Sequence, residues 1–184
     1  LHTDEDTGWY KGDSILAAIG QSEHRYTPIQ LAVYASTIAN KGTRMKCTFM
    51  NRIVSADYQH LLDENEPTVL SELEIPDEAY QAVKEGMIKV SHELGGTAYE
   101  TFKDYPIQVA SKTGTAQTFK NVSDNGAFVC FAARKGGEPE IAIALYGEKV
   151  AHPSNLVPVA EAIVNTYFSR YQTSNAPTNE NRIG

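Results

Sequence analysis

The residues with the clearest capacity for chemistry lie together in the run Lys112-Thr113-Gly114-Thr115. The run falls inside a predicted strand, 107–118, so alternation places Thr113 and Thr115 on one face and Lys112 and Gly114 on the other. Two hydroxyl groups beside an ammonium group form a suitable receptor for a carboxylate. The glycine lets a ligand or a neighbouring backbone approach closely. If the strand borders a cleft, its free N–H groups can pair with an extended peptide, and one can polarise a carbonyl group.

Two other interpretations compete with this one. A lysine followed by threonine occurs in phosphate-binding loops, but that motif requires GxxxxGK[ST] and a strand that leads into a helix. Here Ser111 precedes the lysine, and the strand continues past it. An ordinary polar edge strand, in which threonine is favoured only by β geometry, remains open from these residues alone.

Helices and strands in a definite order must position this run. A capping box formed by Thr27 and Gln30, with Pro28 at the first helical position, predicts a helix that ends at Gly42. Its other faces carry small residues, so we expect the helix to be well buried. A strand, 49–56, and a polar loop rich in Asp and Glu should follow.

A second helix is predicted to begin at Pro76, with an apolar stripe of Tyr80, Val83, Met87 and Leu94, and to end at Gly95-Gly96. Three strands then follow, at 107–118, 126–133 and 141–147. A final helix should begin near Pro153 and carry one apolar side, formed by Leu156, Ala160, Ile163, Tyr167 and Tyr171.

This order predicts an α+β fold with helices packed on a mainly antiparallel sheet. The strands 126–133 and 141–147 are continuous apolar runs, typical of strands covered on both faces. We expect one of those faces to need cover from residues outside the chain.

Composition sets broad limits on function. Hydrophobic residues make up 41% of the 184 residues, enough for a core. The net charge of −7 argues against a nucleic-acid partner, whose phosphates favour a basic face. The histidines and cysteines show no metal-ligand spacing, so neither a metal nor another cofactor is expected. Cys47 and Cys130 are interpreted as small thiols that fill a core.

The run at 112 resembles a known motif once its continuation is included. Lys112 to Gln117 reads KTGTAQ, which is similar to the KTG motif of class B penicillin-binding proteins. Four upstream segments resemble further family motifs, in the family's order: GWYKGDS at 8–14, IGQ at 19–21, TPIQLA at 27–32 and IANKG at 38–42. The first of these is most like the elongation-type penicillin-binding protein 2 branch.

The resemblance implies a D,D-transpeptidase that cross-links peptidoglycan stem peptides through a serine acyl-enzyme and is acylated by β-lactams. It implies that Lys112, Thr113, Gly114 and Thr115 are catalytic, with Lys112 supporting proton transfer. Thr113 and Thr115 would bind the substrate carboxylate, and the Thr115 N–H would donate to the oxyanion. Gln117 is implied among the substrate-binding residues.

The nucleophile of this family lies in an SxxK motif, and no serine of this chain is followed three positions later by lysine. The triplet Ser123-Asp124-Asn125 resembles the family's SxN motif but follows KTG, whereas SxN precedes it, so we interpret the triplet as a chance match. Ser111 stands where the family commonly has glycine. We therefore interpret 1–172 as the C-terminal portion of one transpeptidase domain whose upstream part is missing, and 173–184 as a flexible polar tail.

The same resemblance implies partners and a location. The partners would be the upstream half of the domain, a peptidoglycan stem peptide, β-lactams and cell-wall assembly proteins. The location would be the outer face of the bacterial cytoplasmic membrane. A β-lactamase, a β-lactam sensor or a non-catalytic cell-wall scaffold remain alternatives.

Overall fold

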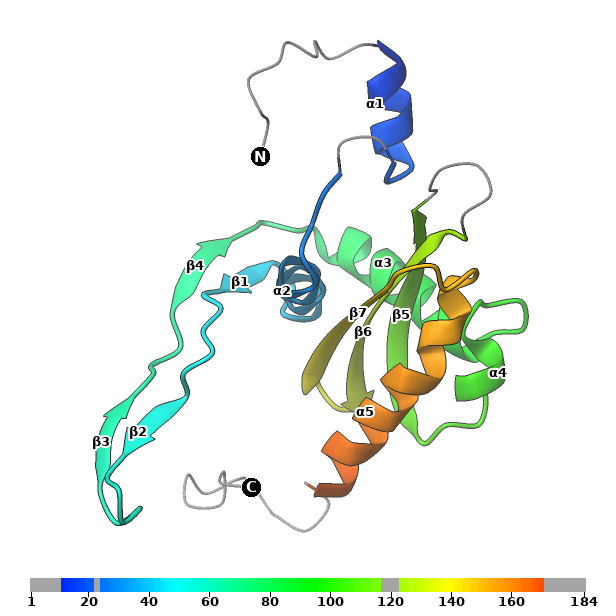
Figure 1. Cartoon of the computed structure of the whole chain (residues 1–184). Helices are drawn as coiled ribbons and strands as arrows, with labels where there is room; N and C mark the ends of the chain where they lie inside the picture. Colours follow the sequence, from blue (N-terminus) through cyan, green and yellow to red (C-terminus); the bar gives the residue numbers. More distant parts are fainter. Residues whose placement is uncertain (1–10, 22–23, 117–122, 171–184) are drawn as a thin grey trace.

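The computed structural model describes residues 11–21, 24–116 and 123–170 (Figure 1). Its central element is an antiparallel three-stranded sheet in the order β5 (Ile107–Ala116), β6 (Asn125–Arg134) and β7 (Ile141–Gly147). The pairing of β5 with β6 continues without a register shift from Ile107 opposite Arg134 to Ala116 opposite Asn125. The α+β fold and the three predicted strands are thus confirmed, and the predicted strand positions 117 and 118 lie outside the described residues.

One face of this sheet packs on the C-terminal helix. Phe128, Cys130 and Ala132 of β6 form a buried cluster with residues of α5 (Val157–Arg170), which lies along that face in Figure 1. The predicted final helix begins instead as a 3-10 turn, η1 (Pro153–Leu156). Of its predicted apolar side, Ala160 is fully buried, Leu156, Ile163 and Tyr167 pack partly buried against the cluster, and Tyr171 lies outside the described residues. The fully or nearly fully buried side chains of α5 are Val157, Ala160, Val164 and Phe168.

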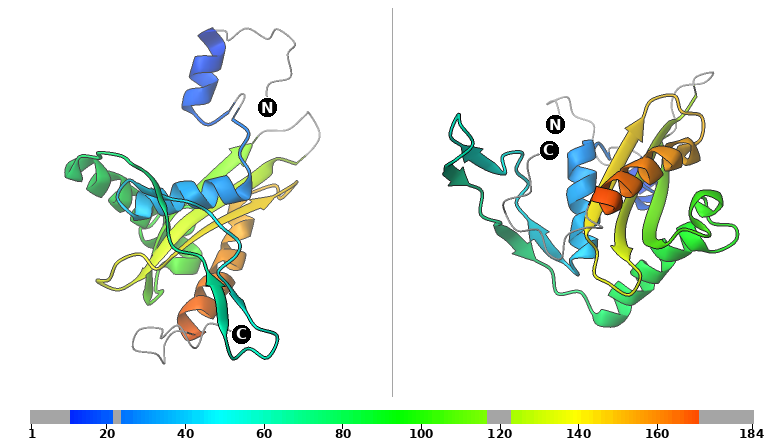
Figure 2. Two further views of the ribbon diagram at one scale, coloured as in Figure 1. Left: turned by 90° about the vertical axis from the view of Figure 1, so that its left-hand side faces the viewer. Right: turned by 90° about the horizontal axis from the view of Figure 1, so that it is seen from below.

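The opposite face packs on two helices, α2 (Pro28–Ala39) and α3 (Asp77–His92), as Figure 2 shows from below. Ala39, Met87, Ala110 and Phe131 form the buried cluster between them. Helices α2, α3 and α5 thus pack on both faces of the sheet, but β7 stays mostly half-buried and Tyr146 is 47% exposed. Our expectation that one face needs cover from residues outside the chain stays a prediction.

Helix α2 begins as predicted. Thr27 Oγ1 accepts from the Gln30 N–H, and the Gln30 side chain accepts from the Thr27 N–H at 2.8 Å. The expectation that α2 is well buried was wrong, because it packs on the sheet through one side only. Tyr34 on its outer side is 61% exposed.

A ribbon of two short antiparallel pairs extends away from the sheet (Figures 1 and 2). Strand β1 (Thr43–Met45) pairs with β4 (Val69–Glu72), and β2 (Arg52–Val54) pairs with β3 (Leu61–Glu64). The predicted strand 49–56 is shortened to β2, and the predicted polar loop contains β3 and β4. No residue of these four strands is buried, so apolar alternation gave no reliable guide to them.

Helix α3 ends two residues earlier than its predicted stripe. Leu94 lies beyond the helix and is 82% exposed, and a short helix that the sequence did not predict, α4 (Tyr99–Phe102), follows.

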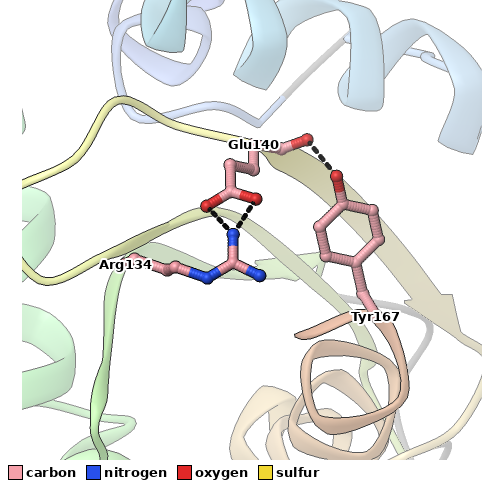
Figure 3. A network of polar contacts seen from close by, with 3 residues as sticks. All are labelled: Arg134, Glu140 and Tyr167. Carbon is pink, nitrogen blue, oxygen red and sulfur yellow. Dashed lines mark hydrogen bonds and ion pairs between the residues drawn. The ribbon is translucent and has the colours of Figure 1, made fainter. Parts of the chain in front are cut away.

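A polar network fixes the end of β6 and the start of β7 to α5 (Figure 3). Arg134 forms an ion pair with Glu140, and the Tyr167 hydroxyl donates to the Glu140 carbonyl at 3.2 Å.

Candidate functional site

The run Lys112 to Thr115 lies on β5, which is an edge strand of the sheet. In an antiparallel ladder, the N–H and C=O of one residue point to the same side, and successive residues alternate. The Val109 N–H donates to His92 rather than to β6. Because the ladder has no register shift, the backbone groups of Thr113 and Thr115 point to this same free edge.

The contacts of two carbonyl groups agree with that assignment. The Thr115 carbonyl accepts from Gln21 Nε2 at 3.0 Å, and the Thr113 carbonyl accepts from Lys112 Nζ at 2.6 Å. The strand therefore presents N–H and C=O groups beside two threonine hydroxyls and an ammonium group. Such an edge can receive an extended peptide as an added strand.

Three polar contacts join this strand, at alternate residues, to α3 and the loop that follows α3. His92 Nε2 accepts from the Val109 N–H at 3.0 Å, and Ser91 Oγ lies 2.7 Å from Ser111 Oγ. Further along, Thr97 Oγ1 lies 3.0 Å from Thr113 Oγ1. The serine pair is fully buried, whereas the threonine pair lies at the surface of the site. Helix α3 and the loop after it therefore fix the position of the strand.

His92 is held as a neutral imidazole. Burial lowers its pKa below the usual 6.5, and a hydrogen bond to the Phe102 carbonyl opposes that shift. Its other ring nitrogen accepts from β5, which only the neutral ring allows. The side chain therefore joins α3, α4 and the site strand.

Gly114 is not required by packing among the described residues. A Cβ built there would lie 3.7 Å from the Ala127 Cβ, an ordinary contact, and its φ is not in the left-handed region. The contrast is Gly126, where a Cβ would lie 2.6 Å from Val150 Cγ2. The absence of a side chain at Gly114 thus leaves the Lys112 face of the strand uncovered at this position, because Gly114 and Lys112 share a face.

The other predicted residues have different positions. Gln117 lies outside the described residues. Asn125, the last residue of the triplet at 123–125, begins β6, and its side-chain oxygen accepts from the Lys149 N–H at 3.0 Å. Since Lys149 has φ of +53°, this contact supports a strained turn, which is a structural role.

Sequence reasoning missed the contributions of Gln21, Ser91, His92 and Thr97. Gln21 belongs to the IGQ segment, which was noted without a role, and the Gly95-Gly96 turn was interpreted only as the end of a helix. Of the two cysteines predicted to fill a core, Cys130 is buried as expected, whereas Cys47 is exposed and the prediction for it was wrong; both thiols are free. Burial raises the pKa of the Cys130 thiol to about 12.

No three His, Cys, Asp or Glu side chains in residues 11–21, 24–116 and 123–170 gather in a way that could hold a metal ion. Within the same ranges, no helix combines the length and apolar character needed to cross a membrane.

Comparison with known proteins gives the class of this fold and strand. Residues 2–167 match the family model of the penicillin-binding protein transpeptidase domain. The chain belongs to this family, and its relatives place it in class B, as the motifs implied.

Two curated relatives illustrate the match. Peptidoglycan D,D-transpeptidase MrdA of Haemophilus influenzae is 27% identical over 178 residues, covering 88% of this chain and 27% of the relative. Penicillin-binding protein 2A of Bacillus subtilis is 34% identical over 160 residues, covering 77% of this chain and 22% of the relative. The chain thus spans about a quarter of the length of these relatives.

Solved structures show the same fold. Penicillin-binding protein 2B of Streptococcus pneumoniae strain R6 matches 94% of this chain and 29% of its own, with a TM-score of 0.76 and 24% identity. Penicillin-binding protein 2 of Pseudomonas aeruginosa, solved in complex with WCK 5153, matches 95% of this chain and 36% of its own, with a TM-score of 0.68 and 26% identity.

Proposed function

We propose that this chain supplies the substrate-binding strand of a peptidoglycan D,D-transpeptidase, and that the serine nucleophile belongs to residues outside the chain. The observation that supports this most directly is the free edge of β5. It carries the backbone of Thr113 and Thr115 next to two hydroxyl groups and the Lys112 ammonium. We propose that 1–172 is one portion of the transpeptidase domain, with 173–184 as a polar tail.

In the proposed reaction, the serine oxygen bonds to the carbonyl carbon between the last two D-alanine residues of a stem peptide. The C–N bond breaks, and the terminal D-alanine leaves with a proton on its amine. An amine of a neighbouring strand then displaces the serine, which regains its proton. The chemistry is covalent catalysis with preorganised charge stabilisation.

The residues of β5 have separate roles in this scheme. The terminal carboxylate, or the matching carboxylate of a β-lactam, accepts hydrogen bonds from the Thr113 and Thr115 hydroxyls. The Thr115 N–H donates to the carbonyl oxygen as it becomes negative. Lys112 supplies positive charge near the carboxylate and supports proton transfer, and Gln117 is assigned to substrate binding. Gly114 leaves room for the substrate backbone.

Partners and location follow from the same proposal. The partners are the upstream part of the domain, stem peptides, β-lactams and cell-wall assembly proteins, and the place of action is the outer face of the cytoplasmic membrane. A Helicobacter pylori relative, penicillin-binding protein 2, has been solved in complex with MreC, which supports an assembly partner.

The experiment measures second-order acylation by a fluorescent penicillin in the protein that contains both this segment and the upstream residues. Lys112→Ala should slow acylation by ~10²-fold or more, the scale of losing one preorganised electrostatic group. The acylation rate of Thr113→Val should lie between the rates of Lys112→Ala and wild type. Ser123→Ala is the matched control and should acylate normally.

Two outcomes would count against the proposal. If Ser123→Ala were acylated far more slowly than wild type while Lys112→Ala were acylated at the normal rate, the triplet at 123–125 and not the KTG run would be the functional motif. Label found covalently on residues 1–184 would place the nucleophile within the chain. Slow release of the acyl group, over hours, separates a transpeptidase from a β-lactamase.

A further inference from the structure

The contact between Thr97 and Thr113 joins a residue outside the KTG run to a residue within it. The two hydroxyl oxygens lie 3.0 Å apart, and either can donate. Thr97 is exposed and Thr113 is half-buried, so the pair lies at the surface beside the free edge of β5.

The loop that carries Thr97 is fixed on both sides. Gly95 has φ of +93°, and a Cβ at Gly96 would lie 2.2 Å from the Val90 carbonyl oxygen, so the chain turns back tightly over the end of α3. On the other side, Ala98 is 2% exposed, and its N–H donates to the Val90 carbonyl at 3.1 Å. The backbone position of Thr97 is therefore set by its neighbours in the chain and does not depend on the Thr97 hydroxyl.

The direction of the hydrogen bond matters for anion binding. A carboxylate only accepts hydrogen bonds, so a Thr113 hydroxyl that binds it must donate its one proton to it. Thr113 Oγ1 can then only accept from Thr97, which gives a chain from Thr97 to Thr113 to the carboxylate. Hydrogen bonds in such a chain polarise and strengthen one another.

We infer that Thr97 is a positioning residue for the carboxylate receptor: its hydroxyl donates to Thr113 and sets the Thr113 proton toward the substrate carboxylate. This inference rests on the proposed function of β5. It adds a second element, the loop after α3, to the recognition of a peptide or β-lactam that ends in a carboxylate.

The test compares acylation by a carboxylate-bearing penicillin with acylation by its methyl ester, in the protein that contains the upstream residues. The measured quantity is the ratio of the two acylation rates. Thr97→Val keeps the shape and removes the hydroxyl, and it should lower this ratio by about 3- to 10-fold, the scale of one net hydrogen bond. Thr97→Ser keeps the hydroxyl and should stay within about 2-fold of wild type.

A purely structural role predicts a different pattern. It would slow acid and ester equally and leave the ratio unchanged, which would overturn the inference, as would a Thr97→Ser variant as impaired as Thr97→Val. A wild-type protein that neither compound acylates would overturn the proposed function itself and this inference with it. If wild type is acylated but Thr97→Val leaves the ratio of acid to ester acylation rates unchanged, only the role of Thr97 is refuted and the proposed function stands.

Discussion

The hydroxyl groups of Ser91 on α3 and Ser111 on β5 lie 2.7 Å apart, and both side chains are fully buried. Ser111 directly precedes Lys112, so this contact fixes the start of the site run to the helix behind it. Each hydroxyl gives the other a partner in an otherwise apolar interface, and unpartnered buried hydroxyls are costly.

The first prediction concerns this pair. Ser91→Ala should destabilise the folded protein by about 1–3 kcal/mol, because the Ser111 hydroxyl is left without its partner. The double variant Ser91→Ala/Ser111→Ala should cost less than the sum of the two single changes, since removing both polar groups leaves no unpaired hydroxyl. Denaturant unfolding of the four proteins measures the coupling. Strict additivity would mean that the two hydroxyls do not depend on each other.

The sequence was a good guide where its signals were local or strongly periodic. The capping box at Thr27 and Gln30 located α2, and continuous apolar runs located β6 and β7, because buried strands favour such runs. The resemblance of Lys112 to Gln117 pointed to the strand that carries the candidate site.

The misses have physical causes as well. Periodicity placed Leu156, Ile163 and Tyr167 on the apolar side of the final helix, where they pack partly buried against the core. It missed Val157, Val164 and Phe168, which are buried more deeply. Contacts such as Thr97 with Thr113 join residues 16 apart through a tight turn, and no local pattern encodes such a pairing.

The second prediction concerns the two thiols. Cys47 is exposed, whereas Cys130 is fully buried with its thiol pKa raised to about 12. An aromatic disulfide reagent at pH 8 should therefore modify Cys47 quickly, and Cys130 only after denaturant unfolds the protein. Cys47→Ser should abolish the fast phase and Cys130→Ser should leave it intact. Fast modification of Cys130 in folded protein would contradict the burial of β6.

The third prediction is a pH dependence of stability. The folded pKa of His92 lies below 6.5, its ordinary value, because burial disfavours the charged ring. The unfolded chain therefore binds a proton more readily, so this residue's contribution is complete above about pH 6.5 and declines as pH falls toward the folded pKa. Below the folded pKa it is constant again.

His92→Gln tests this dependence. A glutamine oxygen can still accept from the Val109 N–H, and it does not titrate. The free energy of unfolding, measured from pH 5 to pH 8, should fall less steeply toward acid in the variant than in wild type. Identical slopes for the two proteins would show that His92 is not the group responsible.

The last prediction separates substrate access from packing at two glycines. Gly114→Ala introduces a Cβ with only an ordinary contact, 3.7 Å from the Ala127 Cβ, so the free energy of unfolding should change by less than about 1 kcal/mol. The same methyl group would project from the face that carries Lys112, so penicillin acylation should slow by ~10-fold or more, since the ligand must approach the backbone closely there. Gly126→Ala is the matched control. Its Cβ would lie 2.6 Å from Val150 Cγ2, so it should destabilise by about 1–3 kcal/mol while the folded fraction acylates normally. Normal acylation of a stable Gly114→Ala variant would show that no ligand passes over this residue.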